Sequence, residues 1–317
     1  MYSKLVKFIR KTFGVEKDFI PLHEPRFFGN ERKYVLDAID STFVSSVGAY
    51  VNKFEAMMCE ITGAKYAIAL VNGTNALHLG LILAGVGKED EVLTQALTFI
   101  ATANAISYCG ATPHFVDVDK ETMGLSPSLL RKYLAAIAIM KDGYCYNKNT
   151  GKRIAACVPM HTFGLALYID ELVELCAEYN IPVIEDAAES FGSVFNGIPS
   201  GKWGDTSCFS FHGSKTLTTG EGGIVLTDRD DLYERMMILR DHGRNPGDTM
   251  FQNTEIGYKY KMSAFQAAFG LAQLERKDEI IQKKRNIFKM YNERLADFSK
   301  VRINPKQENL ENSYWMS

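Results

Sequence analysis

The sequence lacks the features of exported, metal-binding and membrane-spanning proteins. Its six cysteines include no CxxC pair and several lie in apolar runs, which predicts reduced thiols in a cytoplasmic protein, not disulfides or zinc ligands. Its six histidines include no HxxxH pair, so no metal site is expected. No apolar run is long enough to cross a bilayer. The formal net charge of −2 gives no electrostatic reason to expect nucleic acid as a partner.

The remaining composition is typical of a globular protein with a large core. Hydrophobic residues make up 46% of the 317 residues and charged residues 23%. This length suffices for one large domain and part of a second. We expect an N-terminal basic extension at 1–18, a large domain at 19–275 and the start of a small C-terminal domain at 276–317.

The first thirteen residues combine basic and apolar side chains without an acid. The basic residues are Lys4, Lys7, Arg10 and Lys11, and apolar residues recur at helical spacing as Leu5, Phe8, Ile9 and Phe13. This pattern permits an amphipathic helix on an anionic membrane surface. It lacks the long apolar core and the cleavage site of a signal peptide. We favour a helix packed on its own protein or on a neighbouring subunit over membrane contact.

Strand-like and helical patterns alternate between residues 60 and 240. Strands are expected at 66–71, 91–94, 112–118, 154–160, 181–185 and 224–227, and helices at 75–83, 101–108, 127–138, 169–179, 264–274 and 280–298. The polar stretch 141–153 is expected to be a surface hairpin or loop. Alternation of this kind predicts an α/β fold with a mainly parallel sheet and helices on both faces. Ligands of such sheets bind beyond the carboxyl ends of the strands.

A lysine lies among small, turn-forming residues in the stretch 208–223, which reads CFSFHGSKTLTTGEGG. Burial of Lys215 would disfavour its charged form and leave a neutral amine that attacks carbonyl groups. Ser210 could bind an anion while Lys215 reaches a reactive carbon. The three glycines near the end are expected to take positive φ and to let a ligand approach the backbone. A surface lysine in a glycine-rich hairpin explains this stretch alone equally well.

Acidic residues follow the expected strand 181–185 directly. Asp186 and Glu189 would be costly to bury unless they are paired or hydrogen-bonded. Asp186 could be the N-cap of a helix. A carboxylate at one strand end and Lys215 at another also suit a pyridinium cofactor, which needs an acid at its ring nitrogen and a lysine to hold its aldehyde.

Two further strand ends carry candidate ligand contacts. Gly73 and Thr74 begin a helix after the first strand, where free backbone amides could bind phosphate. Phe99 follows the second strand and could stack on a flat ring, although a core phenylalanine is an alternative.

Five motifs in order resemble the DegT/StrS-type sugar aminotransferases, which are fold-type-I pyridoxal 5'-phosphate (PLP) enzymes. They are NGTNALH at 72–78, TFIATANA at 98–105, EDAAES at 185–190, FSFHGSK at 209–215 and TGEGG at 219–223. The resemblance extends over about 19–275. It implies a three-layer α/β/α large domain, a small C-terminal α/β domain that is truncated here, and a cytoplasmic homodimer with shared active sites.

The resemblance also implies roles for single residues. Lys215 matches the Schiff-base lysine that moves the substrate proton, and Asp186 matches the partner of the pyridine nitrogen. Three residues match positions that hold the cofactor phosphate: Gly73, Thr74 and Ser210. Phe99 matches the aromatic residue that stacks on the cofactor ring.

Three positions are less typical of the family. Glu189 matches a position near the cofactor's phenolic oxygen that is often Gln in relatives. Lys259, in the stretch GYKYKM at 257–262, occupies the place of an Asn that relatives donate across the dimer interface to the phosphate. A cation there can still serve a phosphate. His161 and His212 border the site without a role assigned by the resemblance.

The implied reaction is transfer of an amino group from L-glutamate to the C4 ketone of a nucleotide-linked 4-keto-6-deoxy sugar for surface-glycan biosynthesis. The hairpin insertion near 141–153 and the stretch PMHTFG at 159–164 resemble legionaminic-acid-type enzymes, and the later half resembles perosamine-type enzymes. The alternatives are a PLP-dependent sugar dehydratase, in which histidine replaces the lysine, and a PLP-binding regulatory or inactive relative. Lys215 and Asp186 favour the aminotransferase.

Overall fold

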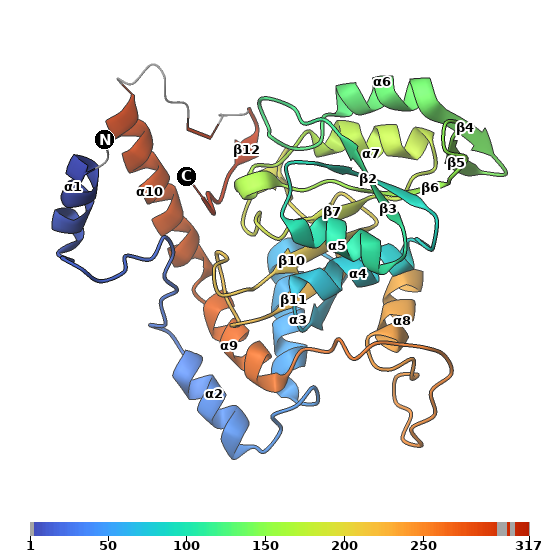
Figure 1. Cartoon of the computed structure of the whole chain (residues 1–317). Helices are drawn as coiled ribbons and strands as arrows, with labels where there is room; N and C mark the ends of the chain where they lie inside the picture. Colours follow the sequence, from blue (N-terminus) through green and yellow to red (C-terminus); the bar gives the residue numbers. More distant parts are fainter. Residues whose placement is uncertain (1–2, 297–302, 305–307, 317) are drawn as a thin grey trace.

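A seven-stranded sheet forms the centre of the molecule. The computed structural model describes residues 3–296, 303–304 and 308–316 (Figure 1). Two sheets of order β1-β11-β10-β7 and β3-β2-β6 are joined by parallel bridges from Cys157 to Val183 and from Met160 to Asp186. The strands are β1 (Tyr66–Leu70), β2 (Glu91–Gln95), β3 (Thr112–Val116), β6 (Ile154–Val158), β7 (Ile184–Asp186), β10 (Thr206–Ser210) and β11 (Gly223–Thr227).

The sheet is mainly parallel, as predicted, and the strands expected from the sequence are present. β11 alone among these seven strands runs antiparallel to both of its neighbours, β1 and β10. The connection 211–222 contains no helix to carry the chain back across the sheet, so β11 returns in the opposite direction. Its register pairs Gly223 with both Leu70 and Ser210, which aligns the ends of three strands beside one another.

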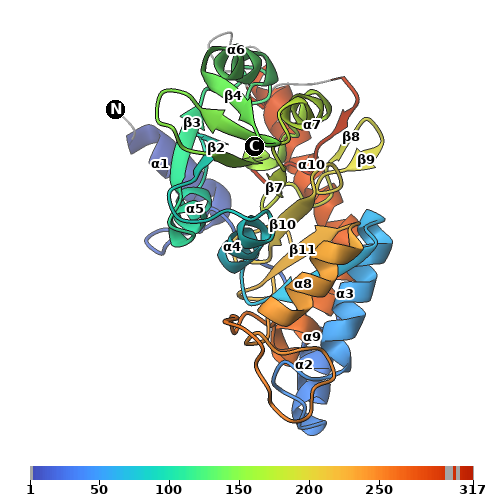
Figure 2. The same cartoon turned by 90° about the vertical axis from the view of Figure 1, so that its right-hand side faces the viewer.

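Helices cover both faces of this sheet, which confirms the three-layer prediction. Successive residues of β1 point to opposite faces: Ile68 and Leu70 pack under one helical layer, and Ala67 and Ala69 under the other. The first layer holds α4 (Gly73–Leu83), α5 (Ile100–Tyr108) and α8 (Asp230–Leu239); the second holds α3 (Ala49–Thr62), α6 (Pro127–Ile137), α7 (Ile169–Glu178) and α9 (Ala264–Leu274). Figure 2 shows α4 and α5 on one side of the strands and α3 and α7 on the other.

Short elements surround this core. The expected polar hairpin is present but starts earlier than 141, since its strands are β4 (Ala138–Lys141) and β5 (Tyr144–Asn147). A small sheet of order β12-β8-β9 combines β8 (Val194–Phe195) and β9 (Ile198–Pro199) with β12 (Leu310–Glu311) near the C-terminus. The remaining elements after residue 20 are α2 (Glu31–Asp40), the 3-10 helix η1 (Thr162–Gly164) and α10 (Lys277–Leu295). The helix expected at 280–298 therefore begins at Lys277, and its predicted end lies outside the described residues.

The basic N-terminal segment forms helix α1 (Ser3–Phe13), as predicted from its spacing. Its apolar residues Val6 and Phe13 are 47% and 64% exposed. None of the helices described is both long enough and apolar enough to span a bilayer.

Candidate active site

A cavity of about 460 Å³ opens beyond the carboxyl ends of the central strands. Seven of the residues to which the sequence assigned a role line it: Gly73, Thr74, Phe99, Asp186, Glu189, Ser210 and Lys215. They lie at or shortly after the carboxyl ends of four strands, β1, β2, β7 and β10. The structure therefore brings together the residues that the motifs indicated, at the sheet edge where parallel sheets bind ligands.

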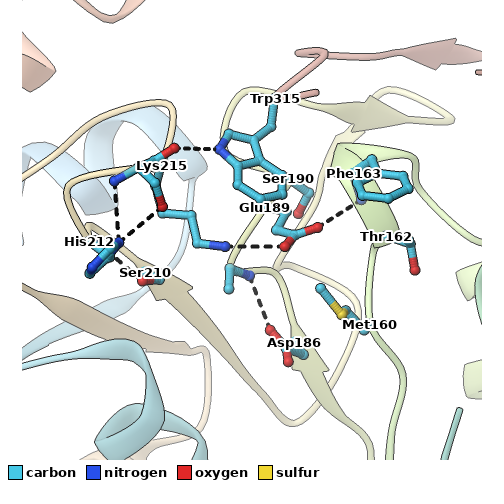
Figure 3. A network of polar contacts seen from close by, with 12 residues as sticks. Met160, Thr162, Phe163, Asp186, Glu189, Ser190, Ser210, His212, Lys215 and Trp315 are labelled. Carbon is cyan, nitrogen blue, oxygen red and sulfur yellow. Dashed lines mark hydrogen bonds and ion pairs between the residues drawn. The ribbon is translucent and has the colours of Figure 1, made fainter. Parts of the chain in front are cut away.

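Lys215 points into this cavity and is not a surface lysine. Its side chain is 13% exposed, and its Nζ lies 3.2 Å from Oε1 of Glu189 (Figure 3). The second oxygen of Glu189 accepts a hydrogen bond from the backbone N–H of Phe163 at 2.8 Å. Burial raises the pKa of Glu189, although the positive charge of Lys215 opposes this effect. Glu189 can thus hold or release a proton beside the lysine amine.

Asp186 lies at the base of the cavity with 2% of its surface exposed. Its Oδ2 accepts a hydrogen bond from the Thr102 hydroxyl at 2.7 Å, and its Oδ1 accepts one from the backbone N–H of Ala188 at 3.2 Å. Burial raises the pKa of Asp186. Turns rather than a helix follow it, so the N-cap alternative is wrong. Burial disfavours the charged form of this carboxylate, and two hydrogen bonds fix its direction. It is therefore suited to bind a cationic N–H group in the cavity, which would stabilise its charge.

The N-terminus of α4 faces Ser210 at another end of the cavity. Asn72 caps this helix by accepting a hydrogen bond from the backbone N–H of Asn75 at 2.9 Å. Only glycine fits at Gly73, because a Cβ there would lie 2.8 Å from Cβ of Ser210. The amides of the first helical turn and the hydroxyls of Thr74 and Ser210 form a cradle of the kind that binds phosphate.

The expectation for the three glycines of 208–223 is only partly correct. Gly220 has a φ of +84°, whereas Gly222 and Gly223 do not have positive φ. A Cβ at Gly223 would collide with the carbonyl oxygen of Asn72. Gly223 therefore allows close approach of the turn that carries Gly73, and not of a ligand.

Two predicted contacts occupy different positions relative to the cavity. Phe99 lies at its rim and is 64% exposed, so the core alternative is wrong. Lys259 does not line this cavity; its Nζ donates to the Ser46 hydroxyl at 3.2 Å and lies 3.6 Å from a carboxylate oxygen of Asp241. Lys259 is therefore directed away from the site of its own chain.

The two histidines without assigned roles differ in their surroundings. His161 is fully buried and lies 3.0 Å from Glu185, which also accepts hydrogen bonds from three backbone amides in 201–204. This pair holds the loop behind β7 and does not enter the cavity. His212 lines the cavity, and its Nδ1 lies 3.0 Å from the Ser214 hydroxyl.

Sequence reasoning missed two residues of the site. Thr102, which orients Asp186, lies within the motif 98–105 and could have been identified there. Trp315 covers Lys215, with the indole ring centre 4.1 Å from Nζ, and donates from Nε1 to the carbonyl oxygen of Ser214 at 2.8 Å. No local pattern indicates this contact, because the two segments are about a hundred residues apart.

These residues fit PLP. The N-terminus of α4 with Ser210 suits its phosphate, the buried Asp186 suits its ring nitrogen, and Lys215 reaches into the same cavity as both. Glu189 supplies a proton-holding group close to the amine of Lys215.

Comparison with known proteins agrees with this geometry. The model of the DegT/DnrJ/EryC1/StrS aminotransferase family matches residues 27–317. The chain is 41% identical over 277 residues to the GDP-perosamine synthase of Caulobacter vibrioides, covering 87% of this chain and 70% of that protein. It is 40% identical over 298 residues to the GDP-perosamine synthase of Escherichia coli O157:H7, covering 94% of this chain and 77% of that protein.

The fold is also similar to solved structures. The PLP form of Spr1654 from Streptococcus pneumoniae, provisionally named a sugar aminotransferase, matches with a TM-score of 0.81 and 26% sequence identity. The match covers 93% of this chain and 76% of that chain.

Proposed function

The chain belongs to the DegT/DnrJ/EryC1/StrS family of PLP-dependent aminotransferases, and we propose that it aminates the C4 ketone of a nucleotide-linked 4-keto-6-deoxy sugar. L-glutamate supplies the amino group and leaves as 2-oxoglutarate. The GDP-perosamine synthases to which the chain is similar favour a GDP-linked sugar as the substrate. The observation that carries this proposal is that Lys215 and the buried Asp186 line one cavity beside the α4 N-terminus.

In this proposal Asp186 and its neighbours hold the ring end of the cofactor. When bound there, PLP would supply a protonated ring that stabilises the electron pair left on the substrate carbon. The carboxylate of Asp186 keeps the proton on the ring nitrogen. Thr102 and the amide of Ala188 fix the direction of that carboxylate, because each occupies one of its oxygens.

Lys215 carries the proton transfers. Its amine removes a proton from the reacting carbon of glutamate and later returns a proton to C4 of the sugar. Oε1 of Glu189 lies 3.2 Å from Nζ of Lys215, so this carboxylate can balance the positive charge of the lysine between these steps. The indole of Trp315 covers the amine and limits the access of water to it.

Residues at the other end of the cavity, with a second copy of the chain, hold the phosphate. Gly73, Thr74 and Ser210 provide amides and hydroxyls, and Phe99 at the rim supplies a ring face. Lys259 points away from its own cavity, which suits a homodimer in which Lys259 of the partner subunit reaches this phosphate. Exposed apolar side chains, such as Ile100 at 62% and Ile256 at 89%, provide surface for such a partner.

The location that suits this chemistry is the cytoplasm. The six cysteines are all free thiols in the structure, and reduced thiols are typical of that compartment. A supply of L-glutamate and nucleotide-linked sugars is available there.

The test is a two-stage assay on the PLP-loaded protein. L-glutamate should convert the absorbance of bound PLP into that of pyridoxamine 5'-phosphate, and a GDP-linked 4-keto-6-deoxy sugar should reverse it with formation of an amino sugar. UDP- and dTDP-linked sugars assayed in parallel identify the nucleotide. Lys215→Ala should abolish both stages, and a variant that still aminates any of these sugars would contradict the mechanism. A product that has lost a hydroxyl without gaining an amine would support the dehydratase.

A further inference from the structure

A second, smaller cavity adjoins the first at Lys215. It has a volume of about 250 Å³ and lies between residues 22–26, the end of α9 and helix α10. Lys215 lines both cavities. Five cationic side chains line the smaller one, namely Arg26, Lys215, Arg276, Lys283 and Lys284, against one acid, Glu24. The cavity therefore presents an excess of positive charge close to the reacting amine.

Four of these cations already have a carboxylate partner, and Lys284 does not. Arg26 pairs with Glu24, Arg276 with Glu31 and Glu279, Lys283 with Glu279, and Lys215 with Glu189. Within the described residues Lys284 makes no ion pair. Its Nζ donates to Nδ1 of His23 at 3.1 Å and to the carbonyl oxygen of Trp315 at 3.3 Å, and burial lowers the pKa of Lys284. A third N–H of this amine remains for a ligand.

Two more buried polar atoms of this cavity have no hydrogen-bond partner in the part of the chain that the structure describes. Burial and the nearby Lys284 lower the pKa of His23 to about 4, so its ring is neutral at pH 7. Because Nδ1 accepts from Lys284, the ring proton is on Nε2, and this N–H is buried and unpaired. The hydroxyl of Thr216 is buried and unpaired in the same way. Unpaired buried donors are costly unless a ligand satisfies them.

We infer that this cavity binds the diphosphate of the nucleotide-linked sugar, which Lys284, His23 and Thr216 contact directly. The inference rests on the proposed function, since that function supplies a diphosphate substrate. An anion would satisfy the free N–H groups of Lys284 and His23 together and would supply the missing counter-charge. The paired cations at the rim, Arg26, Arg276 and Lys283, add to the attraction.

The chemistry of the substrates places the diphosphate here rather than the carboxylate at the reacting carbon of glutamate. That carboxylate is bonded directly to the carbon that loses its proton, so it must lie in the first cavity with Lys215 and Asp186. The diphosphate is attached at C1 of the sugar, across the ring from C4. When C4 reaches Lys215, the diphosphate therefore points away from the reacting carbon. The second cavity meets the first at Lys215, so it can receive a group that extends beyond the sugar ring.

Trp315 connects the two cavities. Its ring covers Lys215 (Figure 3). Its carbonyl oxygen accepts a hydrogen bond from Lys284 at 3.3 Å. An anion held by Lys284 therefore lies next to the residue that covers the reacting amine.

The inference is tested by binding of GDP to the PLP-loaded protein, measured by titration calorimetry without turnover. Lys284→Met removes the charge with little change in volume and should weaken GDP binding at least tenfold, with less than twofold change in binding of guanosine. Glutamate-driven conversion of the cofactor should keep its rate within twofold. Thr216→Val should weaken GDP binding about threefold. Lys289→Met is the matched control, because Lys289 is exposed on the same helix, and it should bind GDP like the wild type.

Three results would overturn the inference. The first is an unchanged GDP affinity in Lys284→Met that circular dichroism shows to be folded. If Lys284→Met does not fold, an unchanged GDP affinity in Thr216→Val would overturn the inference instead. The second is a slower glutamate stage with unchanged GDP binding, which would assign the cavity to the side-chain carboxylate of glutamate. The third is a wild type that binds none of GDP, UDP and dTDP. Wild-type protein that binds GDP through Lys284 but aminates no sugar would instead contradict the proposed function alone.

Discussion

The indole ring of Trp315 lies 4.1 Å from Nζ of Lys215 and is anchored by a hydrogen bond of 2.8 Å from its Nε1 to the carbonyl oxygen of Ser214. A residue near the C-terminus is thus held against the residue that precedes the reacting lysine. The anchor fixes the ring over the amine, and the ring in turn restricts where the amine can point. Stabilisation of a partly buried cation by an aromatic face is worth about 1–2 kcal/mol.

We expect Trp315→Ala to lower kcat by roughly tenfold, because about 1.4 kcal/mol of positioning corresponds to one factor of ten in rate. Trp315→Phe keeps an aromatic face but loses the hydrogen bond to Ser214, so it should lose about threefold. The measurement is single-turnover conversion of bound PLP by L-glutamate. Equal rates in wild type and Trp315→Ala would show that the ring does not position the amine.

Asp186 should control the protonation of the cofactor ring and so the rate of the glutamate stage. We expect Asp186→Asn to slow the glutamate stage by roughly 10²–10³-fold, since the amide carries no charge to retain the ring proton. Thr102→Val removes only the hydrogen bond that directs Asp186 and should cost about tenfold. Thr102→Ser, which keeps the hydroxyl, is the control and should stay near the wild-type rate. The rates of all three variants are compared by stopped-flow absorbance. If Thr102→Ser were as slow as Thr102→Val, the loss would be steric and not due to the missing hydrogen bond.

Gly73 should be sensitive to a single added methyl group. Gly73→Ala places a Cβ 2.8 Å from that of Ser210, so the turn must move and the protein should lose about 1–3 kcal/mol of stability. The same movement displaces the phosphate cradle, and retention of PLP after dialysis should fall. Gly87→Ala is the matched control, because the nearest atom to its Cβ is Oδ2 of Asp90 at 3.8 Å. Chemical denaturation and the PLP content distinguish these two effects.

Asp241 should make the stability of the fold depend on pH in the acidic range. Burial alone would raise the pKa of Asp241, but hydrogen bonds and charge from Arg244 and Lys261 outweigh it and lower this pKa to about 2. Because the pKa of Asp241 is lower in the folded protein than in the unfolded chain, its carboxylate stabilises the fold fully at pH values above the ordinary pKa of 3.8. This contribution is lost as the pH falls through about 2. We expect Asp241→Asn to cost about 2 kcal/mol at pH 7 and clearly less at pH 3. Urea unfolding at both pH values checks this, and a cost independent of pH would contradict the assignment.

By itself the sequence determined the alternation of strands and helices and the residues that follow each strand. These features are local. The turn before α4 needs a glycine, a carboxylate directly after an apolar strand needs a partner, and Lys215 lies in a run of small residues. Each of them lies at a strand end or in the turn that follows it, and a mainly parallel sheet brings such ends to one edge.

Only the tertiary structure decided the direction of β11, the position of Lys259 and the surroundings of Lys215. The direction of β11 depends on the absence of a helix in 211–222, and Lys259 turned out to face away from its own cavity. The contacts of Trp315 with Ser214 and of Lys284 with His23 join segments that are far apart in the chain. Such pairs leave no periodic or local signal, because their proximity arises only when the helices and turns between them have packed.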